Sequence, residues 1–344
     1  MSVKRMEMSR IRLLLLGVAV LGVFSAVGLL ATNFDIYKIS PGNYAEAKWP
    51  GANPNLTWNL NFIGTPSNVV GGGSPQTVLT NAFNAWHSAT YNSSAVTNIA
   101  FTFGSANASL PQTPTIDCQN VIGFDDTTLG AFGSGIIAIT IYATIPSGEV
   151  PSQCGANAPP PCPIAVCIVD ADIMFNPTAT FATSGATTGQ FDLQSIAMHE
   201  IGHMIGLDHS GIAHAVMYPY GDTISIGVQQ TLWTDDMIGA GHLYPGAAPP
   251  NATIEGQVKL DGAGIYGAHV EAVDVTTGNA VTDTLTDPSG NYTLLLFGGS
   301  YYVYVQSLAT DSNHVPYTIG NFSGQAGYGN PLPPNPIDYT GAYY

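Results

Sequence analysis

The spacing of hydrophobic positions divides the chain into two regions. From 53 to 246, runs that alternate with period two are mixed with runs that repeat every three to four residues, a mixture typical of strands and helices in one domain. From 252 to 309 only short alternating runs occur, separated by turn pairs such as Asp261-Gly262 and Ser289-Gly290. We therefore expect an α/β (α+β) domain followed by an all-β sandwich.

Local signals predict the elements of the first region. Alternating or isoleucine-rich runs predict four strands, at 56–62, 99–103, 135–142 and 171–176. A helix is expected over 74–90, where Ser74 is a good N-cap and Pro75 suits the first helical position.

One further helix is expected in the second half of this region. Asp192 is a good N-cap for a helix, and Phe191 and Ile196 stand where a hydrophobic staple would place them.

The segments outside these two regions have their own compositions. Residues 247–251 are an Ala/Pro linker, and residues 310–344 form a tail rich in Gly, Pro and Tyr. Residues 13–31 are apolar and follow a basic start, so residues 1–31 are expected to be a signal peptide or a signal anchor. A short segment, 32–52, leads into the first domain. The protein is then secreted, or tethered to a membrane if the anchor stays uncleaved.

Charge excludes some partners. The formal net charge is −16, and only three of the seven basic residues lie after residue 31: Lys38, Lys48 and Lys259. Nucleic acid and anionic membrane surfaces would repel such a chain, so we expect no nucleic-acid partner and no membrane contact beyond the N-terminal segment. A monomer is expected.

The chain contains four cysteines, an even number that favours two disulfides in an exported protein, with three possible pairings. We expect Cys154 to pair with Cys162, closing a proline-rich loop, and Cys118 to pair with Cys167. The alternative is that the four are free buried thiols.

The strongest chemical signal is HExxHxxGxxH, which begins at His199. On a helix, His199 and His203 lie on one face, where both can bind one metal ion, while Glu200 stands beside the first ligand without binding. Gly206 can take the left-handed conformation that ends a helix, and His209 can then return to the metal. A bare HExxH also arises by chance, but the added glycine and histidine favour one catalytic zinc with an open position.

Downstream residues complete a family pattern. Met217 follows His209 at the distance expected for a Met-turn, and Ser210 directly follows the third histidine. The chain resembles a matrixin-like metzincin on these residues. The resemblance implies a domain with a mixed sheet and an active-site helix, and a zinc endopeptidase that acts on protein or peptide substrates with Glu200 as general base. It also implies that substrate binds along the edge strand near Ile137 and Ala138, and that Tyr218 and Pro219 line the specificity pocket.

The sequence also departs from that family. No histidine lies between His87 and His199, so a second, structural zinc has no ligands. The resemblance also allows bound calcium, but the sequence identifies no residues that would bind it. No cysteine precedes Cys118, so latency through a thiol on the zinc is not expected. His214 and His242 are interpreted as non-ligands because the zinc set is already complete. The segment 230–240 resembles the closing helix of that family, and the resemblance implies that its paired acids, Asp235 and Asp236, brace the Met-turn. By their position alone they would be two exposed acids on a first helical turn.

The second region, 252–309, resembles the carboxypeptidase regulatory-like domain in its turns and strands, such as 254–258 and 286–292. It carries no catalytic constellation, so it is expected to be a spacer or a binding module. Two alternatives to a general endopeptidase stay open: a non-enzymatic surface adhesin built on a zinc fold, and a processing enzyme of narrow specificity.

Overall fold

The computed structural model of the chain describes residues 36–40, 43–124, 136–219, 228–307 and 342–343. The expected signal segment 1–31, the first residue of the strand expected at 135–142 and nearly all of the tail 310–344 lie outside the described residues. Within the described part of the chain, no helix is both long and apolar enough to cross a lipid bilayer.

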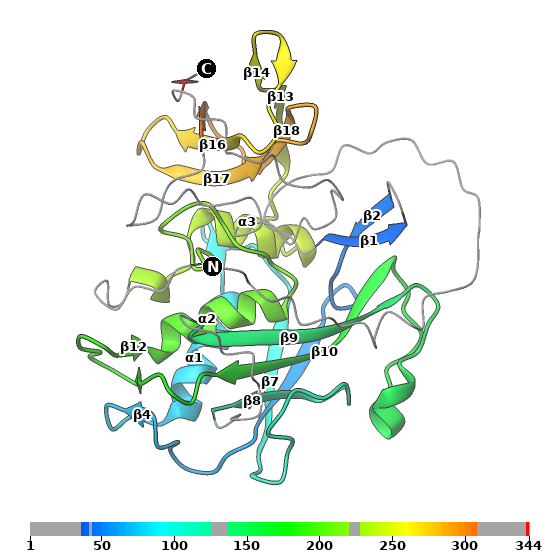
Figure 1. The fold of residues 1–344 in the computed structure, drawn as a ribbon, viewed down its shortest axis with the longest axis vertical. Helices are drawn as coiled ribbons and strands as arrows, with labels where there is room; N and C mark the ends of the chain where they lie inside the picture. The colour runs from blue at the N-terminus through cyan, green and yellow to red at the C-terminus, as the bar shows by residue number, and fades with distance from the viewer. Residues whose placement is uncertain (1–35, 41–42, 125–135, 220–227, 308–341, 344) are drawn as a thin grey trace.

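A five-stranded mixed sheet forms the base of the first region (Figure 1). Its order is β7 (Ala100–Ala106), β3 (Asn55–Leu60), β8 (Asn120–Gly123), β10 (Val166–Phe175) and β9 (Ala138–Pro146). The first four strands are parallel, and β9 lies antiparallel to β10 at one edge. The mixed sheet and the edge position of the isoleucine-rich strand are both confirmed.

Two helices pack together and hold the core of this region. Helix α1 (Pro75–His87) begins at Ser74, whose side chain accepts from Thr77 N, with Pro75 in the first turn, as expected. Helix α2 (Leu193–Met204) begins at Asp192, whose Oδ1 accepts from Ser195 N at 2.8 Å. The buried Trp86 of α1 donates from Nε1 to the carbonyl of Met198 in α2 at 2.9 Å, which fixes one helix against the other.

The sequence missed part of the sheet. Strand β8 has only four residues, all buried, so its sequence lacks the alternation of apolar and polar positions that would predict a strand. Strand β10 begins at Val166, whereas the sequence predicted a start at 171. The acids Asp170 and Asp172 interrupt its apolar run and hide the earlier start from the pattern, although both are buried in the strand. The isoleucine-rich strand extends to Pro146, beyond the expected end at 142.

The remaining elements of the first region are short. They are β1 (Ile36–Ser40), β2 (Asn43–Glu46), β4 (Val69–Val70), β5 (Thr90–Tyr91), β6 (Ser94–Ala95), β11 (Phe181–Ala182), β12 (Phe191–Asp192), the 3-10 turns η2 (Ser152–Asn157) and η3 (Val228–Gln230), and helix α3 (Thr234–Leu243). Strands β4, β11 and β12 form a small parallel sheet, and α2 begins directly after β12.

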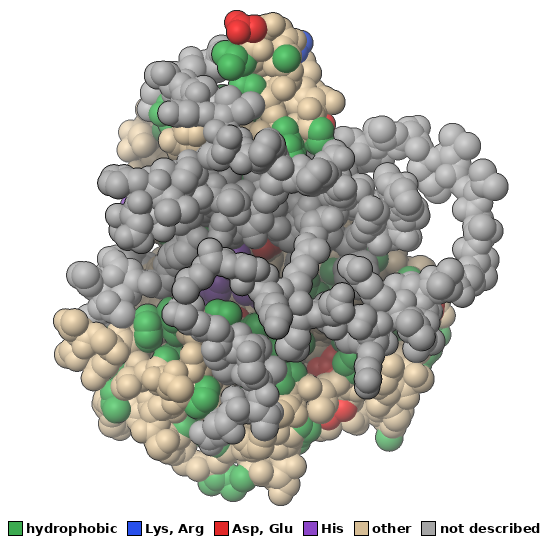
Figure 2. Space-filling view, viewed as in Figure 1, with side chains coloured by type: hydrophobic (Ala, Val, Ile, Leu, Met, Phe, Trp, Pro, Cys, Tyr) green, Lys and Arg blue, Asp and Glu red, His purple; other side chains and the backbone are tan. Residues whose placement is uncertain are grey.

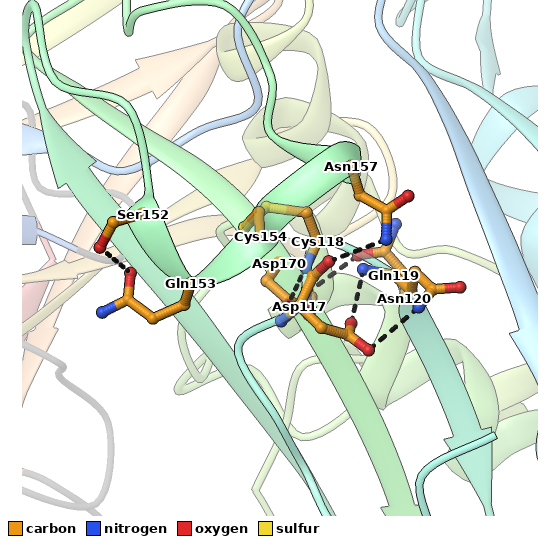
Figure 3. The surroundings of a disulfide bond; sticks show 10 residues. Asp117, Cys118, Gln119, Asn120, Ser152, Gln153, Cys154, Asn157 and Asp170 are labelled. Atoms are coloured by element: carbon orange, nitrogen blue, oxygen red, sulfur yellow. Dashed lines mark hydrogen bonds between the residues drawn. A yellow bond between two sulfur atoms is a disulfide. The ribbon is translucent and has the colours of Figure 1, made fainter.

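The expected disulfide pairing is wrong. Cys118 bonds to Cys154, and Cys162 bonds to Cys167. The reason lies in the backbone around the two pairs. Asp170 Oδ2 accepts from the N–H groups of Asp117 and Cys118, which places Cys118 beside the turn η2 that carries Cys154 (Figure 3). Such a long-range carboxylate contact cannot be inferred from cysteine spacing.

The second region contains two sheets around one apolar core. Strand β13 (Ala252–Gln257) pairs with β18 (Asn291–Leu296), while β17 (Ala280–Leu285), β16 (His269–Asp274), β19 (Tyr301–Gln306) and β20 (Ala342–Tyr343) form the other sheet. A two-stranded ribbon, β14 (Lys259–Leu260) and β15 (Ala263–Gly264), is attached. Leu294 and Leu296 of one sheet pack with Val270 and Val305 of the other, so this β-rich region has its own core.

The β-rich region lies against α3, on the side away from α1 and α2, as Figure 1 shows. Trp233, which precedes α3, donates from Nε1 to the carbonyl of Ala280 in β17 at 2.7 Å. Tyr91 stacks on Phe297 with ring centroids 3.9 Å apart. The two regions are therefore in direct contact, rather than joined only by the segment 247–251.

Candidate metal centre

Helix α2 brings two histidines of the sequence motif together. Nε2 of His199 lies 3.1 Å from Nε2 of His203, one helical turn away. The Nδ1 atom of His199 lies 2.7 Å from the carbonyl of Val216, and that of His203 lies 2.8 Å from the carbonyl of Leu207. A carbonyl only accepts, so both Nδ1 atoms carry the proton and both Nε2 atoms present lone pairs to each other.

Two facing lone pairs repel unless a cation lies between them. Two nitrogens that share a tetrahedral zinc ion at the usual bond length lie about 3.3 Å apart, close to the observed separation of the two Nε2 atoms. Burial lowers the pKa of His199 and, together with the charges of His199 and His209, lowers that of His203 well below its usual value. Both rings are therefore neutral at pH 7, as metal binding requires.

The third ligand arrives through a turn. Gly206 has a φ of +97°, and a side chain there would meet the carbonyl oxygen of Ala47. Only glycine fits both demands. The chain then reverses, and the ring of His209 lies with its centroid 4.8 Å from that of His203. The ligand atoms of His199, His203 and His209 all lie within 4.8 Å of one another, an arrangement consistent with a catalytic zinc.

Met217 packs against the helix turn that carries His199 and His203. Its sulfur packs against Gly202, in the turn of α2 between the two histidines, at a point where an added Cβ would collide with it. The Met217 side chain is buried, and the backbone carbonyl of Met217 accepts from Ser210 N at 2.9 Å. The expected Met-turn therefore supports α2 from below and also holds the residue that follows His209.

Asp236 fixes the backbone of that turn. Its carboxylate accepts from the N–H groups of Val216 at 2.9 Å and Met217 at 3.1 Å, and from Trp233 N at the start of α3. Both Asp235 and Asp236 are only 2% exposed, so the interpretation of two exposed acids is wrong. The bracing role is confirmed for Asp236, whereas Asp235 lies elsewhere, beside Ser210 and Asp283.

Glu200 is the acid next to the histidines. It is 5% exposed, and burial raises its pKa to about 7 despite a hydrogen bond from Thr140. Thr140 Oγ1, on β9, lies 2.6 Å from Glu200 Oε2 and 2.9 Å from the Glu200 carbonyl. A carboxyl group with a pKa of about 7, on the helix that carries His199 and His203, suits proton transfer.

Comparison with known proteins agrees with this geometry. Residues 153–245 match the family model of matrixins. This matrixin segment contains the three histidines, Glu200, Met217 and both aspartates of α3.

Individual relatives share the same part of the chain. A stretch of 65 residues is 45% identical to metalloendoproteinase 2-MMP of Arabidopsis thaliana, which covers 19% of this chain and 16% of the relative. A stretch of 103 residues is 32% identical to karilysin of Tannerella forsythia, covering 28% and 21% respectively. A third, of 37 residues, is 54% identical to metalloendoproteinase 1 of Glycine max, covering 11% and 12%. The chain thus spans only about a fifth or less of each of these relatives.

The residues predicted to bind substrate lie on the edge strand and directly after Met217. Ile137 precedes the edge strand β9 and Ala138 begins it, and both are half-buried. Tyr218 and Pro219 directly follow Met217 and are also half-buried.

The two extra histidines lie elsewhere. His242 Nε2 contacts Glu46 Oε1 at 2.7 Å, and the ring of His214 packs near that of Trp233. Among the described residues, only His199, His203 and His209 form a group that can hold a metal ion. Figure 2 shows histidine side chains near the middle of one face, and hardly any Lys or Arg among the coloured side chains.

No local pattern in the sequence marks Thr140, and its role can be tested. Thr140→Val removes the hydroxyl that contacts Glu200, and a hydrogen bond to a charged group contributes about 1.5–3 kcal/mol. We expect kcat/KM for a peptide to fall roughly ten-fold or more, with zinc content unchanged. Thr140→Ser is the matched control because it keeps the hydroxyl. Equal rates for the valine variant and the wild type would show that the contact has no part in catalysis.

Proposed function

We propose that this protein is a secreted zinc-dependent endopeptidase. The observation that supports it most is the convergence of the ligand atoms of His199, His203 and His209, with the buried carboxyl group of Glu200 on the helix that carries the first two. A purely structural zinc site would have no use for Glu200, and burying an acid without a role costs stability. This makes the non-enzymatic adhesin the weaker alternative.

The chemistry follows from the placement of these groups. Bound at the three histidines, zinc would lower the pKa of a water molecule and polarise the scissile carbonyl. Glu200 would take a proton from that water and deliver it to the leaving amine. Thr140 holds the Glu200 carboxylate toward β9, and Asp236 and Met217 keep the ligand cluster rigid.

Substrate binding is proposed along β9. Within the described residues this strand pairs only with β10, so its outer edge can accept an extended peptide as a further strand. The strand passes Glu200 at Thr140, which would bring a peptide backbone close to the histidines. Ile137 and Ala138 would contact the peptide, and Tyr218 and Pro219 would line its side-chain pocket.

The remaining assignments concern the whole chain. Residues 53–246 are proposed as the catalytic domain, 247–251 as a linker and 252–309 as a carboxypeptidase regulatory-like β-sandwich, preceded by the signal segment 1–31 and the short segment 32–52, and followed by the tail 310–344. Two disulfides and the acidic composition support a monomer that works outside the cell and binds peptides or proteins but no nucleic acid.

A peptide-library digest tests the proposed activity. The purified full chain should cleave internal bonds, lose activity in a chelator and regain it when zinc is returned. It should need no thiol-modifying activation, because the four cysteines form two disulfides and none is free. Mass spectrometry of the products would separate a broad endopeptidase from a processing enzyme of narrow specificity. No chelator-sensitive cleavage in any sequence context would exclude both.

A further inference from the structure

The β-rich region contributes a carboxylate to the loop that carries the third histidine. Asp283, in the middle of β17, accepts at Oδ2 from the N–H of Gly211 at 3.0 Å. Its Oδ1 lies 3.4 Å from Ser210 Oγ, and that hydroxyl accepts from Ile212 N at 3.1 Å. One carboxylate from a strand more than 70 residues away therefore holds the residues that directly follow His209.

This contact is buried and closely packed. Asp283 is 3% exposed and Ser210 is fully buried. A Cβ added at Gly211 would collide with Asp283 Oδ2 and would come within 2.6 Å of His269 Nε2. The loop and the strand are therefore fitted to each other, with no space left for even a methyl group at this position.

A histidine of the same β-rich region balances the charge. His269 Nε2 lies 2.7 Å from Asp283 Oδ2, and His269 Nδ1 lies 3.7 Å from Glu271. Burial lowers the pKa of His269, but the hydrogen bond and charge of Asp283, with the charge of Glu271, outweigh it and raise the pKa above its usual value. A buried carboxyl group needs a hydrogen-bonding partner, and His269 supplies one to the same Asp283 oxygen that accepts from Gly211 N.

The matrixin segment holds the same loop from its other side. Ser210 N donates to the carbonyl of Met217, and Asp236 fixes Met217 in turn. Asp235, from the same turn of α3, lies close enough to Asp283 that burial and then the Asp283 charge raise its pKa. The loop after His209 is thus held between the Met-turn and β17.

We infer that Asp283 is a positioning residue for the zinc ligand His209, so that the β-rich region forms part of the support of the metal centre. This inference rests on the proposed zinc site. It differs from the expectation that the second region is a spacer or a binding module, because a spacer would have no buried contact with the ligand loop.

Zinc affinity, measured by competition with a chromogenic chelator, tests this role directly. Asp283→Ala in the full chain should weaken zinc binding roughly ten-fold or more, as loss of supporting partners around metal ligands does. Asp283→Asn should recover most of the loss, because its amide oxygen still accepts from Gly211 N. Glu271→Gln is the matched control: it removes a charge from the same histidine without contacting the loop, and it should keep wild-type affinity.

The outcomes are separable. A folded Asp283→Ala variant that binds zinc within two-fold of the wild type overturns the inference. If that variant does not fold, Ser210→Ala removes only the hydroxyl beside Asp283, and it should weaken zinc binding several-fold; unchanged affinity there also overturns it. If the wild type binds zinc but cleaves no peptide, the proposed protease activity fails while the zinc measurement still decides the role of Asp283.

Discussion

Replacing Glu200 by glutamine is expected to reduce peptide cleavage by roughly a hundred- to ten-thousand-fold, the contribution of a general base. Zinc content should stay near one per chain, because Glu200 is not among the three residues whose ligand atoms converge. Glutamine keeps the size of the side chain and an oxygen that can accept from Thr140, so the fold should be unaffected.

The measurement for this prediction is kcat/KM on a quenched fluorescent peptide, together with metal analysis of the same sample. Glu149→Gln, in an exposed turn far along the chain from the metal centre, is the matched control. A Glu200→Gln variant with near-normal turnover would show that another group moves the proton, and the mechanism would then be wrong.

The second large effect concerns the metal itself. His203→Ala is expected to lose both zinc and measurable activity, because two histidines cannot hold a catalytic zinc as three do. The wild type should also unfold at a higher temperature with zinc than with chelator, since a ligand that binds only the folded state stabilises it. The variant should show no such difference.

His87→Ala provides the control for this loss. His87 also contacts a backbone carbonyl through Nδ1, that of Ile99 at 2.8 Å, but it is not part of the ligand cluster. It should keep full zinc content and activity. Retention of tight zinc binding by His203→Ala would mean that the metal is held by other residues.

Local signals were enough to predict the parts of the site that lie on α2. The N-cap Asp192, the spacing of His199 and His203, and the glycine that ends the helix act over a few residues, so the sequence shows them directly. The same holds for Ser74 and Pro75 at the start of α1. Each of these is decided by neighbours within one helical turn.

Contacts between distant residues could not be predicted. Thr140 meets Glu200 across 60 positions, and Asp283 meets Gly211 across 72. Nothing marks these two residues among the many threonines and aspartates of the chain until the sheet and the β-rich region are folded. The disulfide pairing failed for the same reason, because Asp170 determines where Cys118 lies.

The proposed activity requires one zinc ion held by three histidines, with the fourth position open to solvent. Zinc-edge X-ray absorption on the purified, active protein measures this most directly. We expect three nitrogen ligands at about 2.0–2.1 Å and one further light atom from solvent, with no sulfur. A fourth protein ligand, a sulfur at about 2.3 Å, or activity in a sample without zinc would contradict it.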